Sequence, residues 1–203
     1  MPDPDTYLNN DYIFIRNYKP DNTKHGGVGL FYKNSLPLKV RNDLSFEESI
    51  VVELKYGRKK IFFTVLYRSP SFNYSTAEFA TFISNFENLY TKIKQENPYM
   101  TFFTGDFNGQ SKLWYPGGTT TPEGKEIENL ISSLGLHQVI NGPTNFEPNK
   151  NPTCIDLIIT DQPNLILDSG TRASPDFFCH HQIIYCKVNF NLPPLPPYER
   201  EMW

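Results

Sequence analysis

Two polar residues stand where an apolar segment of this chain ends. In FFTGDFNGQSKLW, residues 102–114, residues typical of a buried strand run directly into Asp106 and Asn108. Because these residues are two positions apart, the alternation of an extended chain points them to the same side. A carboxylate can activate or orient a water molecule, and an amide can hold a phosphate oxygen. The same residues also suit a tight turn, so this segment alone leaves a turn and a site as equal alternatives.

Three further candidates occur in or beside segments that are otherwise apolar. Asp156 lies inside IDLIIT, residues 155–160, where a buried carboxylate must be paired or must serve a site. His181 precedes another apolar segment, and Tyr67 ends one. Taken singly, each also fits a structural role: Asp156 as a member of a buried pair, His181 as an ordinary core or surface histidine, and Tyr67 as an aromatic residue of a sheet. Taken with the first two, they could perform metal-assisted hydrolysis, with His181 as a proton-transfer group oriented by Asp156.

Short runs of β-branched and aromatic residues predict the strands that position these groups. The runs are bounded by turn residues, as strands usually are. Gly57 is expected at the tip of a hairpin between two of them. The predicted strands cover residues 12–16, 28–33, 49–55, 61–67, 99–104, 155–160 and 183–190.

Two helices are also predicted. Apolar residues recur at helical spacing from Phe79 to Ile93, after a capping box that runs from Ser75 to Glu78. A second helix should begin at Thr121 as N-cap, followed by Pro122, and should stop at Gly135.

Length and composition indicate one folded domain without a membrane span. The chain has 203 residues, a net charge of −3 and a pI of about 5.8, so it lacks the overall basic field of many nucleic-acid-binding proteins. We predict an N-terminal tail over 1–10, a domain over 11–190 and a proline-rich linker over 191–203. Cys154, Cys179 and Cys186 are interpreted as reduced core thiols of an intracellular protein, nuclear or cytoplasmic.

Four motifs in order carry a family resemblance over roughly residues 11–190. They are YRSPS (67–71), TGDFNGQSKLW (104–114), PTCIDLIIT (152–160) and HHQII (180–184). Together they resemble the endonuclease/exonuclease/phosphatase superfamily, and more narrowly the apurinic-type endonuclease domain of non-LTR (LINE-type) retrotransposons. The segments HGGVGLFYK and GLHQVINGPTNF are similar to the same domain. The resemblance implies an α/β fold of the DNase I-like type, in which two sheets form a sandwich with helices outside.

The resemblance also implies hydrolysis of a DNA phosphodiester with one or two divalent ions, usually Mg²⁺, or Mn²⁺. It implies that Asp106 activates the attacking water, that Asn108 binds the scissile phosphate and that Asp156 orients His181. Tyr67 would contact the phosphate or metal region. Asp106 and Asn108 would hold the metal.

Two departures from the family pattern weaken the expected metal site. The family's first strand carries an Asn, and a Glu in an ETW-like motif follows it; this chain begins past both. Where the family has Ser-Asp-His, this chain has Cys179-His180-His181, so His180 is expected to be a weak metal ligand. Mg²⁺ prefers oxygen ligands, and imidazole suits it less well. We therefore expect an N-terminally truncated domain that lacks the first strand region, leaves a sheet edge open and is a poor nuclease.

DNA is the predicted partner, with a reverse transcriptase domain downstream in a full element, and the chain is predicted to be a monomer. The main alternatives are a catalytically inactive retrotransposon remnant and another phosphatase of the same superfamily. Weak, local DNA contacts are expected from Arg16, Lys24, Arg68, Lys112 and Trp114.

Overall fold

The computed structural model describes residues 11–17, 27–46, 48–70, 76–175 and 179–190. The predicted N-terminal tail, the proline-rich linker, Lys24 and the Ser75 end of the capping box lie outside these residues. No helix in the described ranges is long and apolar enough to cross a membrane. Cys154 is buried and Cys186 half-buried, but Cys179 is exposed, which corrects its assignment to the core.

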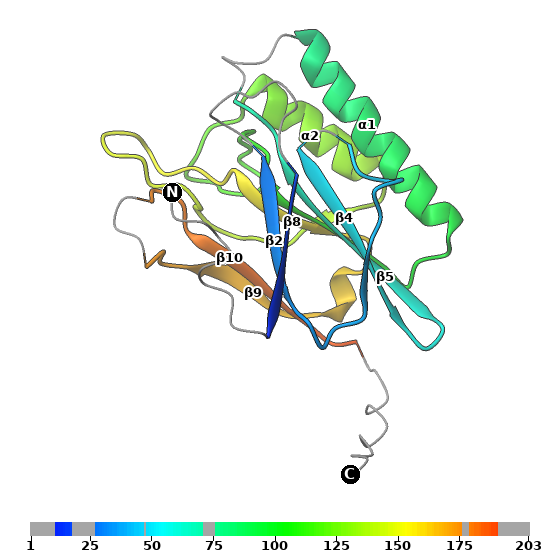
Figure 1. Ribbon diagram of the computed structural model, residues 1–203. Helices are drawn as coiled ribbons and strands as arrows, with labels where there is room; N and C mark the ends of the chain where they lie inside the picture. The colour runs from blue at the N-terminus through cyan, green and yellow to red at the C-terminus, as the bar shows by residue number, and fades with distance from the viewer. Residues whose placement is uncertain (1–10, 18–26, 47, 71–75, 176–178, 191–203) are drawn as a thin grey trace, which may run out of the picture.

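A six-stranded mixed sheet forms the centre of the molecule (Figure 1). β5 and β6 are parallel, and the other neighbouring pairs are antiparallel. Gly57, with φ of 58°, turns the chain between β4 and β5 as predicted. In spatial order the strands are β3 (Leu38–Val40), β4 (Ser49–Tyr56), β5 (Lys59–Tyr67), β6 (Met100–Asp106), β8 (Asp156–Thr160) and β7 (His137–Gln138).

Both predicted helices are present and cover one face of this sheet (Figure 1). α1 (Thr76–Gln95) places Phe86 against Phe103 of β6, with ring centroids 4.3 Å apart. α2 (Pro122–Ser133) begins as predicted, because the Thr121 hydroxyl accepts the backbone N–H of Gly124 at 3.1 Å. The buried apolar core therefore lies largely between the helices and the sheet.

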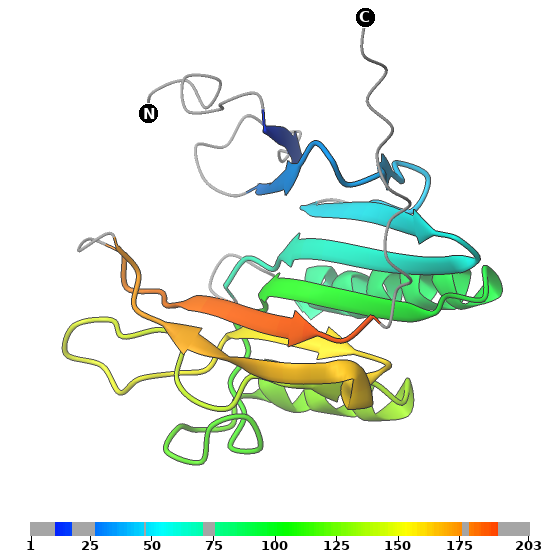
Figure 2. The same ribbon diagram turned by 90° about the horizontal axis from the view of Figure 1, so that it is seen from below.

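The opposite face carries two small antiparallel sheets (Figure 2). β1 (Tyr12–Asn17) pairs with β2 (Val28–Lys33), and β9 (Ile166–Arg172) pairs with β10 (Ile183–Val188). A 3₁₀ turn over Pro163–Leu165 leads into β9. Helices, sheet and second layer together give the expected α/β sandwich, but the second layer is divided into two separate pairs of strands.

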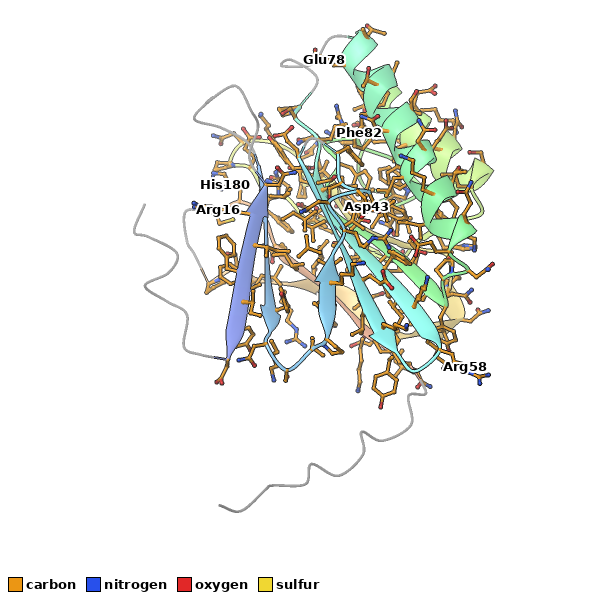
Figure 3. The ribbon with its side chains drawn as sticks, turned by 45° about the vertical axis from the view of Figure 1, so that its right-hand side comes forward. Arg16, Asp43, Arg58, Glu78, Phe82 and His180 are labelled. Carbon is orange, nitrogen blue, oxygen red and sulfur yellow. The ribbon has the colours of Figure 1, made fainter. Side chains whose placement is uncertain are left out.

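Strand register brings three candidate residues to one end of the central sheet. Tyr67 of β5 is the register partner of Asp106 of β6, which is also the partner of Asp156 of β8. Phe103 faces α1, so alternation points Asp106 toward the second layer. This end of the sheet lies far from the β4–β5 turn, where Arg58 is seen (Figure 3). His181 lies two residues before β10 and can reach the same end from the second layer.

Candidate active site

The loop after β6 depends on an unusual backbone. Gly105 has φ of 143°, and a Cβ there would lie 1.8 Å from the carbonyl oxygen of Leu66. Only glycine permits this approach of β6 to β5. Asp106 Oδ1 then accepts the backbone N–H of Asn108 at 2.8 Å. Asn108 has φ of 48°, a left-handed conformation that asparagine tolerates better than most residues. The predicted turn and the predicted site are therefore the same structure.

Arg68 holds this loop from inside the protein. Its side chain is fully buried, at 0% exposure. Nε donates to the carbonyl oxygen of Phe107 at 2.5 Å, and Nη2 donates to that of Asn108 at 2.7 Å. In return, Nδ2 of Asn108 donates to the carbonyl oxygen of Arg68 at 2.7 Å. The prediction that Arg68 contacts DNA is therefore corrected: its guanidinium is buried, and Nε and Nη2 bind the loop.

The remaining predicted DNA contacts divide into buried and exposed residues. Trp114 is only 7% exposed and belongs to the apolar core, so its predicted contact is corrected as well. The side chains of Arg16 and Lys112 are exposed. Contacts of these two residues with DNA stay a prediction.

Asp156 and His181 form the expected pair across the two layers. Nδ1 of His181 lies 2.9 Å from Oδ2 and 3.1 Å from Oδ1 of Asp156. Thr144, which is completely buried, donates its hydroxyl to Oδ2 of Asp156 at 2.7 Å. The same hydroxyl oxygen accepts the backbone N–H groups of Ile155 and Asp156, at 3.1 and 3.0 Å. Asp156 is thus fixed on two sides, and its carboxylate fixes the imidazole in turn.

Sequence analysis missed two residues that contact this pair. Thr144 braces Asp156, and Nδ2 of Asn145 lies 2.9 Å from Nε2 of His181. Both belong to the GPTNF segment, which contributed to the family resemblance but received no role. The only available signal was a hydroxyl and an amide side by side in an otherwise turn-like segment.

Crowding of charge at the sheet end changes how its groups ionise. Burial, and then the neighbouring carboxylate of Asp156, raise the pKa of Asp106 to about 7. The hydrogen bond that His181 donates to Asp156 raises the pKa of His181, although partial burial of the ring opposes this. Burial also raises the pKa of Tyr67, with smaller contributions from Asp106 and Glu48. Near neutral pH, Asp106 is poised for proton exchange, and Tyr67 remains a neutral phenol that can donate a hydrogen bond.

Glu48 is a second buried carboxylate near Tyr67. It is 1% exposed, and Oε1 accepts the backbone N–H of Gly27 at 3.2 Å. Its carbonyl oxygen accepts the backbone N–H of Tyr67 at 3.0 Å. No motif in the sequence marks Glu48, yet its charge contributes to the electrostatics of this end of the sheet.

One group of side chains could hold a metal ion. Ligand atoms of Asp106, Asp156 and His181 lie within 4.8 Å of one another. Two carboxylates supply the hard oxygen donors that divalent cations such as Mg²⁺ prefer. Burial, and then the charge of Asp156, raise the pKa of Asp106, and a cation would offset that charge. The donor set therefore fits a divalent ion. His180 is not in this group and its side chain is exposed, so its role as a weak metal ligand stays a prediction.

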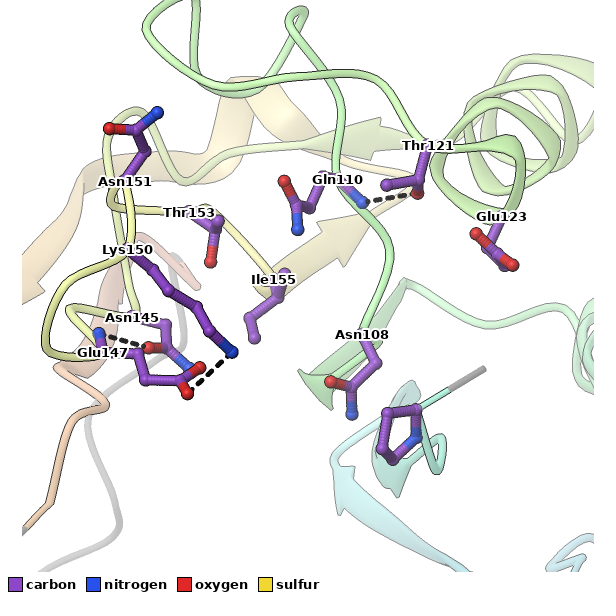
Figure 4. Close-up of a pocket in the computed structure, with 11 residues that line it drawn as sticks. Asn108, Gln110, Thr121, Glu123, Asn145, Glu147, Lys150, Asn151, Thr153 and Ile155 are labelled. Carbon is purple, nitrogen blue, oxygen red and sulfur yellow. Dashed lines mark hydrogen bonds and ion pairs between the residues drawn. The ribbon is translucent and has the colours of Figure 1, made fainter. Parts of the chain in front are cut away.

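A polar cleft of about 410 Å³ lies beside the site (Figure 4). Asn108 and Asn145 reach it from the two sides of the candidate site. Gln110 lines it from the loop after β6, Thr121 from the start of α2, and Lys150 from the loop before β8. Glu123 and Glu147 also line the cleft, and Lys150 is paired with Glu147 at 2.7 Å. The wall is therefore rich in polar groups but carries no excess of positive charge, which suits a polar ligand.

The raised pKa of Asp106 predicts a specific dependence of stability on pH. A folded-state pKa of about 7 lies above the ordinary value of 3.8, so the folded state holds this proton more tightly than the unfolded chain. The resulting stabilisation is complete below about pH 4 and is lost as the pH rises through about 7. Asp106→Asn should therefore be more stable than the wild type at about pH 8, by on the order of 2–4 kcal/mol, and nearly equal at about pH 4.

Denaturant unfolding at both pH values measures this difference, and the exposed Asp168→Asn is the matched control. The asparagine can still accept the backbone N–H of Asn108, so the loop should be kept. If the stability of Asp106→Asn depends on pH as that of the wild type does, Asp106 does not have a raised pKa in the folded state.

Comparison with solved structures identifies the fold class of this protein. The structure is similar to the endonuclease domain of TRAS1, a telomere-specific non-LTR retrotransposon, with a TM-score of 0.71 and 16% identity over 89% of this chain and 81% of that one. It is also similar to the 3′–5′ exonuclease NExo of Neisseria meningitidis (TM-score 0.59, 14% identity, 89% and 80% covered). An endonuclease/exonuclease/phosphatase family protein of Leptotrichia buccalis gives a TM-score of 0.59 at 14% identity, with 92% and 75% covered. The chain thus has the DNase I-like endonuclease/exonuclease/phosphatase fold.

Sequence then gives the family. Residues 61–185, more than half of the chain, match the family model described as endonuclease-reverse transcriptase. The protein therefore belongs to the endonuclease-reverse transcriptase family, as the motifs indicated. No curated protein sequence matches the chain at a significant level.

Proposed function

We propose that this protein is the endonuclease unit of a non-LTR retrotransposon and hydrolyses phosphodiester bonds in DNA. One observation carries the proposal: Asp106, Asp156 and His181 converge at one end of the sheet, with Asp156 hydrogen-bonded to His181. Family membership supports DNA as substrate and a reverse transcriptase as partner. The TRAS1 domain, whose fold this chain shares, is a retrotransposon endonuclease by name.

Each residue has a task that follows from its surroundings. Asp106, with a pKa of about 7, accepts a proton from the attacking water near neutral pH. Asp156 keeps the His181 ring in place through Nδ1, so that Nε2 faces the reacting groups. Tyr67 donates its phenolic hydrogen to a phosphate oxygen. Asn108, anchored through Arg68, presents the rest of its amide to the same phosphate.

Asp106 and Asp156 would hold the divalent ion, for which we propose Mg²⁺ or Mn²⁺. When bound, such an ion neutralises charge on the phosphate and stabilises the leaving oxygen. The two carboxylates otherwise repel each other, which is the second cause of the raised pKa of Asp106.

Nicking of supercoiled plasmid DNA tests this proposal. We expect conversion to the open circle in Mg²⁺ or Mn²⁺ and none in excess EDTA, and the same assay measures how poor the nuclease is. Parallel assays with a phosphomonoester and with sphingomyelin address the alternative of another phosphatase. Turnover of either small substrate without nicking would replace the proposal by that alternative. Absence of all three activities would favour the inactive remnant.

A further inference from the structure

The loop between β6 and α2 carries the most exposed large apolar side chain among the described residues. Leu113 is 77% exposed, while its neighbour Trp114 is buried in the core. A single apolar residue at the surface is ordinary and needs no function by itself. Leu113 differs from such residues because its loop has a fixed backbone, stands beside the candidate active site and carries a cation next to it.

Hydrogen bonds fix the backbone that presents Leu113. The hydroxyl of Ser111, a buried residue, accepts the backbone N–H of Leu113 at 2.9 Å and donates to the Glu128 carboxylate of α2. On the returning side of the loop, the hydroxyl of Thr120 accepts the backbone N–H of Lys112 at 3.1 Å. Leu113 is therefore presented to solvent by a preformed turn, so a ligand that contacts it need not order the loop.

The base of this loop is closed beside the polar cleft. The backbone N–H of Thr121 donates to the carbonyl oxygen of Gln110 at 3.0 Å, and Thr121 Oγ1 accepts the N–H of Gln110 at 3.3 Å. Both residues line the cleft. The loop (green) and the loop between β7 and β8 (yellow) leave the central sheet at the end where Asp106 lies (Figure 2). A DNA duplex is too wide for the cleft, so a duplex that brings a phosphodiester to Asp106 extends across these loops.

Lys112 supplies positive charge next to Leu113. Its side chain is exposed and forms no ion pair with any described residue, whereas Lys125 of α2 and Lys150 of the cleft are paired with glutamates. An ammonium group of this kind can bind a DNA phosphate. An apolar side chain beside it can enter between two base pairs from the minor groove, as the wedges of many DNA-bending proteins do. The two side chains together therefore suit duplex DNA.

A protein partner fits this loop less well than DNA does. The centre of a protein–protein interface is an apolar patch to which several residues contribute. Leu113 is isolated instead, because the other exposed residues of the loop are polar or small or are proline. They are Lys112, Pro116, Gly117, Thr119 and Thr120.

We propose that Leu113 is a wedge that enters a DNA duplex between two adjacent base pairs, while Lys112 binds a neighbouring phosphate. The inference rests on the proposed function and narrows its substrate to duplex DNA that can be unstacked locally. Leu113 contacts bases and not the scissile bond, so it acts in substrate binding and specificity. Pyrimidine–purine steps are the favoured sites of entry, because they unstack most readily.

The fluorescence of 2-aminopurine, which rises when this base loses its stacking, tests the wedge. The probes are short duplexes that carry the base beside different base-pair steps, with every pyrimidine–purine step included. On saturation with the wild type in excess EDTA and low salt, we expect a rise at one step. Leu113→Ala should abolish the rise at saturation and weaken binding about two- to tenfold, since the cost of unstacking offsets part of the gain from burying leucine. Leu113→Met keeps a long apolar side chain and should retain the rise.

Two further variants separate the wedge from other effects. Leu167→Ala is the matched control, because Leu167 is also exposed, at 59%, but lies on β9. It should bind and unstack the duplex as the wild type does. Lys112→Ala should keep the rise at saturation but reduce the slope of log affinity against log salt concentration by about 0.9, the contribution of one phosphate contact.

The possible outcomes decide between the inference and its rivals. A rise that Leu113→Ala retains, saturation by the wild type without any rise, or no saturable binding to these duplexes would overturn the inference. A changed oligomeric state of Leu113→Ala, in place of changed DNA binding, would assign Leu113 to a protein contact and overturn it as well. Because no hydrolysis occurs in EDTA, a wild type that unstacks the duplex but does not nick plasmid DNA counts against the proposed function alone. A wild type that nicks DNA without a rise that depends on Leu113 counts against the inference alone.

Discussion

His181→Ala should lower plasmid nicking in Mg²⁺ by about 10²- to 10⁴-fold, the usual contribution of a positioned proton-transfer group. Both ring nitrogens and the link to Asp156 vanish together, while the side chain is 37% exposed, so the fold should survive. Initial rates of conversion from supercoiled to open-circle DNA measure the effect. Circular dichroism of the same preparations checks that the variant is folded.

His137→Ala is the matched control, because this histidine is exposed and lies on the edge strand β7. It should nick at the wild-type rate. Asp156→Asn should also lower nicking, since the ring loses its ionised partner and the ion loses one of its two carboxylates. Retention of wild-type activity by His181→Ala would remove His181 from the mechanism and leave its pairing with Asp156 as a structural contact.

Arg68→Ala should be the most damaging substitution outside the reacting groups. Two carbonyl oxygens lose a charged, fully buried donor, which should reduce the free energy of unfolding by about 3 kcal/mol and the melting temperature by about 6–12 °C. The loop from Asp106 to Asn108 would also shift, and a displacement of about 1 Å can cost about 10²-fold in rate. Thermal unfolding and nicking rates measure the two effects separately.

Arg58→Ala provides the control, because Arg58 is exposed at the β4–β5 turn (Figure 3). It should leave stability and nicking close to wild type. Arg68→Lys keeps the charge but loses the planar fork, so it should recover little activity. Added guanidinium should restore part of the nicking by Arg68→Ala in the temperature range where that variant is folded. An Arg68→Ala variant that melts and nicks like the wild type would show that the loop from Asp106 to Asn108 keeps its conformation without Arg68.

The periodic spacing of apolar residues predicted most of the secondary structure, because those residues form the buried core. The helix from Thr76 to Gln95 and the strands around it bury apolar faces whose spacing is visible in the sequence. β9 was missed for the opposite reason. Its sequence, ILDSGTR, has little apolar alternation, and the strand is held by pairing with β10.

The sequence could identify only those site residues whose type is unusual for their surroundings. Asp106, Asp156 and His181 interrupt apolar segments, and such interruptions are visible without a structure. Their meeting depends on strand register, which no local pattern encodes. Charge misled the prediction for Arg68, because a guanidinium usually lies at the surface and here satisfies backbone carbonyls inside the protein.

Because the second layer is divided, its β1–β2 ribbon should open locally more readily than the central sheet. β1 and β2 pair only with each other among the described strands, and side-chain ties such as that from Asn17 Nδ2 to the carbonyl oxygen of Ser49, 2.9 Å long, connect them to the central sheet. A two-stranded ribbon is marginally stable by itself, so its amide protons should exchange with solvent long before those of β5 and β6. One of these ties runs from Gly27 to Glu48, the carboxylate near Tyr67. An opening of the ribbon that carries Gly27 with it would therefore remove a hydrogen-bond donor from the Glu48 carboxylate, so the stability of the ribbon and the surroundings of Tyr67 are linked.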